Sequence, residues 1–128
     1  MFFGVLPDLF SWTIYLFYKI IKREKFGKPN ISSIPKWVHV LYGITHSVFV
    51  FGIVGLILFL VLGFVPVYLW AWLIHILIDI PTHSRDFLPT PFLWPLSDWK
   101  FPGFSWGQKW FMVVNYAAII IVFLIMVL

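Results

Sequence analysis

The stretch "FVPVYLWAWLIHILIDIPTH", residues 64–83, joins an apolar run to regularly spaced ionisable side chains. Residues 64–74 are apolar enough to lie in lipid, and His75, Asp79 and His83 then follow at four-residue intervals. Helical residues four apart share a face, so His75 and Asp79 are predicted to project together. A carboxylate inside a membrane is costly unless it is neutralised, paired or metal-bound, which makes this segment a candidate functional site.

The composition of the whole chain predicts a membrane protein. The 128 residues are 62% hydrophobic and 11% charged, and a soluble domain of this kind would expose large apolar patches. We therefore expect residues 1–128 to form a single polytopic membrane domain. Six of the nine basic residues fall within residues 19–36, between apolar runs, which indicates a cytoplasmic loop rather than a nucleic-acid-binding face.

The apolar runs predict an all-α integral membrane protein, a compact bundle of about four transmembrane or half-spanning helices. Pro7 is expected near the start of the first helix and Pro81 at the end of the third, because proline disrupts a helix interior and restricts the residue before it. The last helix is expected to close the bundle. The helices are predicted at about residues 6–22, 37–62, 66–80 and 108–128.

Residues 81–107 hold five of the nine prolines, so no long helix is expected there. Backbone without regular hydrogen bonds is tolerated at membrane depth only where protein or water covers it. The segment is therefore predicted to be an interfacial or partly re-entrant loop whose tryptophans lie at headgroup level, namely Trp94, Trp99 and Trp106. The basic residues predict that the loop 19–36 lies in the cytoplasm.

The ionisable residues within the apolar segments predict a metal site. Counting inward from the cytoplasmic helix ends places four side chains in one layer, namely Asp8, His46, His75 and Asp79. There is no cysteine, and two His with two Asp suit Zn²⁺ best, with Mn²⁺ or Fe²⁺ as alternatives. We expect His46, His75 and Asp79 to be catalytic. The candidates for supporting these ligands are His39, Thr45, Thr82 and His83.

Three sequence blocks resemble a known family. They are "GVLPDL" (4–9), "YGITHSVFVF" (42–51) and "WLIHILIDIPTHSRDFLPTPFLWPLSDWKF" (72–101). In this order they resemble the blocks of the YdjM-like inner-membrane proteins, which are described as metal-dependent hydrolases and as LexA-binding. The matching positions are Pro7-Asp8, Gly43-Ile44-Thr45-His46-Ser47, His75 with Asp79, Thr82, and Trp94-Pro95.

The resemblance implies a compact helical fold in the cytoplasmic (inner) membrane of a prokaryote, and metal-dependent hydrolysis. The chain departs from the family pattern at two places. Phe10 stands where the family has a second Asp, and Leu41 and Tyr42 stand where it has a His-Arg pair. One or two ligands of the family pattern are therefore missing.

We expect hydrolysis of an ester or phosphoester of an amphiphilic, lipid-like substrate by metal-activated water, since this chemistry needs no Ser or Cys nucleophile. Two alternatives stay open at this point. The same Asp and His residues could brace helices in a non-enzymatic membrane interaction or assembly protein, or they could form an ion or proton pathway. The expected partners are the lipid bilayer, the amphiphilic substrate and further copies of the chain, and no nucleic acid or organic cofactor is expected.

Overall fold

A computed structural model describes residues 2–24, 34–86 and 88–128. The predicted all-α class is confirmed, because these ranges contain helices and no strand, apart from one backbone bridge between Ser84 and Gly103. Half of the predicted basic loop 19–36, namely residues 25–33, lies outside the described residues. The helices are α1 (Phe2–Asp8), a π-helical stretch (Leu9–Thr13), α2 (Ile14–Ile21), α3 (Lys36–Thr45), α4 (Val48–Leu62), a 3₁₀ turn (Val67–Leu69), α5 (Trp70–Thr82) and α6 (Lys109–Val127).

The first helical segment begins earlier than predicted. It runs from Phe2 to Ile21, so Pro7 lies inside the helix instead of near its start. Proline has no N–H and its ring crowds the preceding turn. The chain accommodates it just before the wide π-helical turn, where the Ser11 hydroxyl donates to the Pro7 carbonyl at 2.9 Å. π-helical turns are rare and are frequent at functional sites, and this one directly follows Asp8.

The helix predicted over residues 37–62 is not continuous, because the chain breaks between α3 and α4 with a bend of 54°. Tertiary partners satisfy the backbone groups that this break frees. The Val48 N–H donates to the Phe92 carbonyl at 3.0 Å, and the Trp72 indole N–H donates to the Thr45 carbonyl at 2.6 Å. The Ser47 hydroxyl caps α4 by accepting from the Val50 N–H at 3.2 Å. The break is therefore held in place by the loop and by α5.

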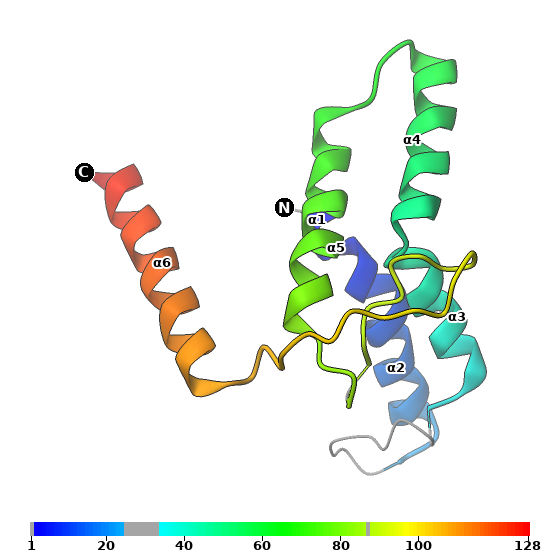
Figure 1. The fold of residues 1–128 in the computed structure, drawn as a ribbon, viewed down its shortest axis with the longest axis horizontal. Coiled ribbons are helices and arrows are strands. Elements are labelled where there is room, and N and C mark those ends of the chain that lie inside the picture. Colours follow the sequence, from blue (N-terminus) through cyan, green and yellow to red (C-terminus); the bar gives the residue numbers. More distant parts are fainter. Residues whose placement is uncertain (1, 25–33, 87) are drawn as a thin grey trace.

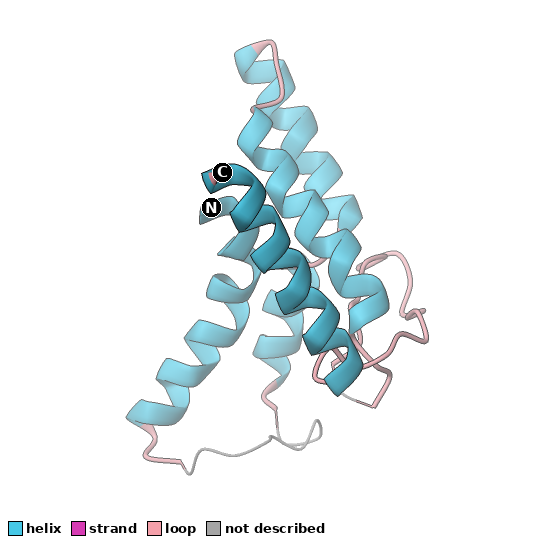
Figure 2. Cartoon of the chain, turned by 90° about the vertical axis from the view of Figure 1, so that its left-hand side faces the viewer, coloured by secondary structure: helices cyan, strands magenta, loops and turns pink. Residues whose placement is uncertain are grey.

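Helices α4 and α5 form an antiparallel pair that lies side by side in Figures 1 and 2. The turn between them uses Gly63 at φ +77°, in the left-handed region that favours glycine. Helix α5 begins later and ends later than the predicted 66–80, and Pro81 lies in its last turn. The helix continues past this proline because the Thr82 hydroxyl donates to the Ile78 carbonyl and the His83 N–H donates to the Asp79 carbonyl.

The described part of the segment between α5 and α6 forms no helix, as predicted for 81–107. It crosses from the end of α5 to the α3–α4 break and back (Figure 1). The ring of Trp94 packs directly on Gly43 in α3, and its predicted position at headgroup level stays a prediction. A Cβ atom on Gly43 would lie 3.1 Å from two ring carbons of Trp94. Trp99 and Trp106 are exposed.

Helix α6 does not close the bundle, and that prediction is wrong. None of its residues is buried, and it stands apart from the other helices (Figure 1). Among the described residues it is the only helix that is long and apolar enough to cross a membrane by itself. Helices α3 and α4 meet the same requirement only when taken together across their bend. The described structure therefore supports one membrane-crossing helix and not four.

Candidate metal centre

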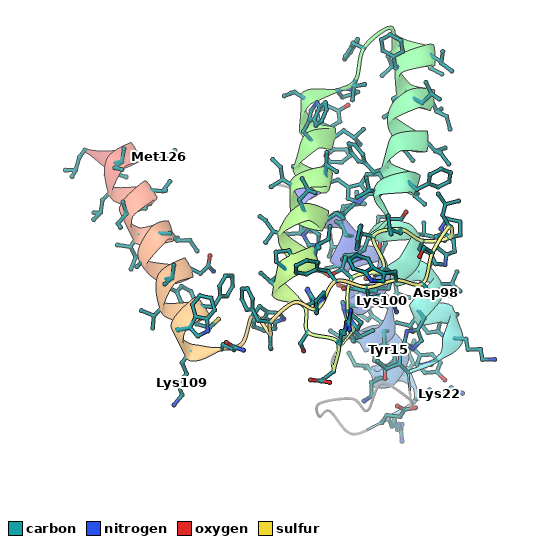
Figure 3. The ribbon with its side chains drawn as sticks, viewed as in Figure 1. Tyr15, Lys22, Asp98, Lys100, Lys109 and Met126 are labelled. Atoms are coloured by element: carbon teal, nitrogen blue, oxygen red, sulfur yellow. The ribbon has the colours of Figure 1, made fainter. Side chains whose placement is uncertain are left out.

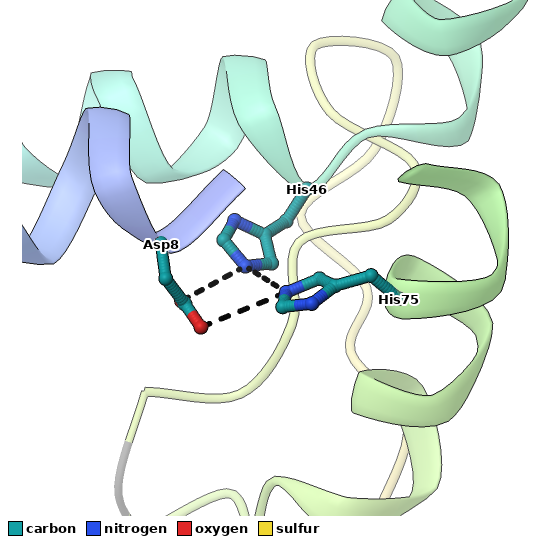
Figure 4. Close-up of side chains that lie close together, drawn as sticks. All are labelled: Asp8, His46 and His75. Atoms are coloured by element: carbon teal, nitrogen blue, oxygen red, sulfur yellow. Dashed lines mark hydrogen bonds and ion pairs between the residues drawn. The ribbon is translucent and has the colours of Figure 1, made fainter. Parts of the chain in front are cut away.

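Three side chains from separate parts of the chain meet where α1, α5 and the α3–α4 break come together (Figure 4). His46 Nε2 lies 3.3 Å from His75 Nε2 and 3.6 Å from Asp8 Oδ1. His75 Nε2 lies 3.8 Å from Asp8 Oδ2. One ligand atom of each residue falls within 4.8 Å of the others, so Asp8, His46 and His75 lie close enough to one another to hold a metal ion.

Asp79 joins the same group. Its Oδ2 atom lies 3.3 Å from His46 Nε2 and 3.2 Å from His75 Nε2. The His75–Asp79 contact is the one that their spacing on α5 predicts. The structure therefore brings together all four residues that the sequence singles out, although they come from three separate segments.

The three inner ligand atoms form a nearly equilateral triangle. Its edges are 3.3 Å between the two Nε2 atoms, and 3.3 Å and 3.2 Å from these atoms to Asp79 Oδ2. In a tetrahedral zinc site with bonds of about 2.0 Å, two ligand atoms are about 3.3 Å apart. His46, His75 and Asp79 therefore have the spacing of three corners of such a site. Asp8, whose oxygens lie slightly farther away, is the outer member of the group.

The hydrogen bonds of His46 show which ring nitrogen faces the other ligands. His46 Nδ1 lies 3.2 Å from the Tyr42 carbonyl, which can only accept a hydrogen bond. The Thr45 hydroxyl, 3.0 Å from the same nitrogen, donates its proton to the Leu41 carbonyl at 3.0 Å. Nδ1 of the neutral ring therefore carries the proton. Its Nε2 lone pair faces the other three residues, as in a metal-ligating histidine oriented by a hydrogen bond from its other nitrogen.

A positive charge at the centre of the group would suit this arrangement. The Nε2 lone pair of His46 faces Asp79 Oδ2 at 3.3 Å and Asp8 Oδ1 at 3.6 Å, and acceptor atoms repel one another at such distances. A metal cation would attract all of these atoms together. A proton on one imidazole would form one or two hydrogen bonds and leave the remaining contacts unpaired. The donor set, which has two imidazoles and two carboxylates, suits a divalent ion such as Zn²⁺.

The helix break positions His46. Its side chain is 0% exposed, and the ring packs against the Tyr42 ring with centroids 4.0 Å apart. Hydrogen bonds hold the chain on both sides of His46. Before it, the Thr45 carbonyl accepts from the Trp72 indole N–H. After it, the Ser47 hydroxyl donates to the Trp94 carbonyl, and the Val48 N–H donates to the Phe92 carbonyl.

Three of the four predicted supporting residues lie around the group. Thr45 contacts His46 Nδ1 directly. His83 Nδ1 lies 3.2 Å from the Asp79 carbonyl and 3.9 Å from its Oδ1 atom. Thr82 lines the adjoining cavity but uses its hydroxyl for the Ile78 carbonyl within α5. His39 is not part of the group and lines a separate cavity with Asp98 and Lys100.

Two contacts that support the group were not predicted from the sequence. The Thr90 hydroxyl donates to the Asp79 carbonyl at 3.0 Å, which ties the loop to α5 beside the ligands. The Tyr42 hydroxyl is 3.4 Å from the Leu88 carbonyl while its ring packs on His46. Tyr42 and His46 are four residues apart, a spacing that could have indicated their contact. No local signal indicates Thr90, because it lies in an irregular segment, eleven residues from its partner Asp79 in α5.

A cavity of about 560 Å³ adjoins the group. Asp8, Asp79 and His83 lie in its polar wall, and Asp8 is 51% exposed there, whereas Asp79 is only 13% exposed. Further lining residues come from α6 and from the loop before it, namely Trp106, Phe111, Met112 and Asn115. The cavity therefore has a polar end at the ligands and apolar sides.

No family model, curated protein or solved structure matches this chain. The resemblance to the YdjM-like proteins stays a prediction that rests on the three sequence blocks alone. All four clustered residues fall within those blocks.

Proposed function

We propose that this chain is a membrane-embedded, metal-dependent hydrolase that cleaves an ester or phosphoester of an amphiphile. The observation that carries the proposal is the triangle of His46 Nε2, His75 Nε2 and Asp79 Oδ2, with edges of 3.2–3.3 Å, beside a cavity. Two His and one carboxylate are a ligand set of catalytic zinc sites, which leave a position for water or substrate.

The residues of the group have different tasks in this proposal. A divalent cation held there supplies a Lewis acid and lowers the pKa of water to near neutrality. Buried His46 and half-buried His75 and Asp79 hold the cation, and Thr45 and the Tyr42 carbonyl fix the His46 ring. Asp8 completes the ligands from the exposed side of the group, where the carboxyl end of α1 reaches the cavity. Substrate would enter from this side.

The surface supports a location in a lipid bilayer. The exposed side chains of α4 and α6 are overwhelmingly apolar, which is far more apolar surface than a soluble protein carries. The basic side chains of Lys22 and Lys109 lie at the same end of the molecule, whereas Met126 lies at the other end of α6 (Figure 3). In this proposal α6 crosses the bilayer and the other helices enter it in part as a compact bundle, with the basic end in the cytoplasm. An inner membrane of a prokaryote follows only from the family resemblance.

The cavity supports an amphiphilic substrate. Its polar wall lies at the ligand group and would take the scissile bond. Trp12, Ile78 and Phe111 offer apolar walls for a hydrocarbon chain. A lipid-like substrate could approach from the bilayer past α6, which is not packed against the other helices.

Metal analysis of the purified protein tests the proposal. After incubation with Zn²⁺ and removal of free metal, we expect about one equivalent in the unchanged protein and little in His75→Ala or Asp79→Asn. His39→Ala is the matched control, because His39 is a half-buried histidine outside the group, and it should retain the metal. Equal metal content in all four proteins would rule out the site.

Thermal unfolding in detergent separates this proposal from a purely structural role. If the four residues only brace helices, the two site variants lower the melting temperature and a chelator has no effect on the unchanged protein. If they hold a metal, the chelator lowers the melting temperature of the unchanged protein and of His39→Ala, but not that of the site variants.

A further inference from the structure

The charges around the cavity restrict which amphiphile it can accept. Its ionisable wall residues are Asp8, Asp79 and His83, and among the described residues no Lys or Arg lines it. Arg85 is exposed and donates to the Lys100 carbonyl at 3.1 Å. Lys109, at the start of α6, points away from the other helices (Figure 3). A negatively charged headgroup would find no Lys or Arg side chain among the described residues that line the cavity.

A metal does not leave spare positive charge. One divalent cation with two carboxylates and two neutral imidazoles has a net charge of zero. A phosphoester would bring at least one further negative charge next to Asp8 and Asp79, where like charges repel one another. Phosphoryl-transfer sites offset this charge with Arg, Lys or a second metal ion. The described residues provide one group of possible ligands and none of these cations at the cavity.

The remaining wall groups suit an uncharged headgroup. Asn115 offers a neutral amide from α6, and Thr82 offers a hydroxyl oxygen whose proton is already donated to the Ile78 carbonyl. Amide and hydroxyl groups bind hydroxyls and carbonyls without adding charge. Trp12 and Met112 lie along the apolar sides, where an acyl chain would pack.

Resting on the hydrolase function proposed above, we infer that the substrate is an uncharged carboxylic ester of a long-chain acid, such as a monoacylglycerol, and not a phosphoester. In its hydrolysis the water oxygen forms a bond to the ester carbonyl carbon, and the bond from that carbon to the alcohol oxygen breaks. The alcohol oxygen takes one proton of the water. The resulting carboxylic acid releases another proton to solvent and leaves as a carboxylate.

Two probes that differ by one phosphate test this inference. Monooleoylglycerol and oleoyl lysophosphatidic acid carry the same acyl chain on glycerol, and their products distinguish the bond that is cut, namely oleate or inorganic phosphate. With the zinc-loaded full chain in detergent we expect oleate release from monooleoylglycerol at least tenfold faster than any product from lysophosphatidic acid. Native mass spectrometry with the corresponding octadecyl ethers should show the same preference in binding, independently of turnover at the ester.

A charge added to the cavity wall should change this preference. Asn115→Lys places a cation on the α6 wall, so we expect the ratio of the two probes to fall to about threefold or less. Gln108→Lys is the matched control, because this substitution adds the same charge directly before α6, at an exposed position outside the cavity. The ratio of the two probes in this variant should equal that of the unchanged protein.

The outcomes separate the two proposals. Inorganic phosphate released from lysophosphatidic acid as fast as oleate from monooleoylglycerol would overturn the inference and leave the hydrolase proposal intact. An equal change of the probe ratio in Asn115→Lys and Gln108→Lys would also overturn the inference, because the selectivity would then not come from the cavity. If the zinc-loaded protein cleaved neither probe, the hydrolase proposal would fail and this inference with it.

Discussion

Helices α5 and α6 are both apolar, yet they have opposite roles in the fold. Helix α6 has 19 residues and a hydropathy typical of a membrane-crossing helix, and none of its residues is buried. Helix α5 has 13 residues, ends beyond a proline, and buries Trp72 and Ile76. It also carries two of the four clustered ionisable residues. The more apolar helix contributes only a wall to the cavity, and the less apolar one builds the site.

The difference shows that hydropathy reports the solvent of a helix and not its packing. In lipid, apolar side chains gain little from exchanging lipid for protein, so association depends on close packing and interhelical hydrogen bonds. Helix α5 has both, because its Ala71 lies 3.9 Å from the Cβ position of Gly4 and the Trp72 indole bonds to the Thr45 carbonyl. Helix α6 has no comparable contact among the described residues.

The largest expected effect on stability comes from the loop that covers the end of α5. A Cβ atom on Gly103 would lie 2.5 Å from the carbonyl oxygens of Pro81 and His83, which are backbone atoms that cannot move aside. We expect Gly103→Ala to lower the free energy of unfolding by about 3 kcal/mol, the upper end for overpacking. The measurement is denaturant or thermal unfolding in detergent.

Gly107→Ala is the matched control at the α6 end of the same loop. Its nearest neighbour would be the Ser105 hydroxyl at 3.7 Å, an ordinary contact. An equal loss of unfolding free energy in Gly103→Ala and Gly107→Ala would contradict the close approach of the loop to α5.

Buried and exposed isoleucines on the two helices give the next comparison. Ile76 on α5 is 0% exposed and Ile120 on α6 is 57% exposed. Ile76→Ala should cost about 2 kcal/mol, the low end for this truncation, because lipid solvates the unfolded side chain and mainly packing is lost. Ile120→Ala should leave unfolding unchanged. A similar loss in both would mean that α6 packs against protein, for example in an oligomer, which titration of the protein-to-detergent ratio would reveal.

The smallest expected effect concerns the hydrogen bond that holds the helix break. Trp72→Phe keeps most of the ring but removes the donor to the Thr45 carbonyl, so we expect a loss of about 1 kcal/mol. Because Thr45 adjoins His46, zinc affinity should fall as well. Trp110→Phe removes an exposed indole bond to Gln108 on α6 and should change neither quantity. Unfolding and zinc titration of both variants check this prediction. Unchanged zinc affinity in Trp72→Phe would show that the hydrogen bond at the helix break does not position the metal ligands.

The candidate site was predictable to an unusual extent because its residues are conspicuous. Ionisable side chains in apolar segments have few tolerable environments, so Asp8, His46, His75 and Asp79 could be selected without knowing the fold. Their convergence confirms the spatial part of that prediction. The exclusion of His39 was not predictable, because its seven-residue spacing from His46 implies a shared face only if the helix is continuous, and the helix ends at Thr45.

The sequence by itself determined the helical class, the approximate extent of the apolar segments, the irregular loop and the four ionisable residues, because these depend on local composition and on the 3.6-residue period. Only the tertiary structure decided where the long second segment breaks and which groups orient His46. It also decided that α6 stands apart. Those features depend on partners distant in sequence, such as Phe92, Trp94 and Trp72, whose hydrogen bonds compensate for a broken helix that no local pattern favours.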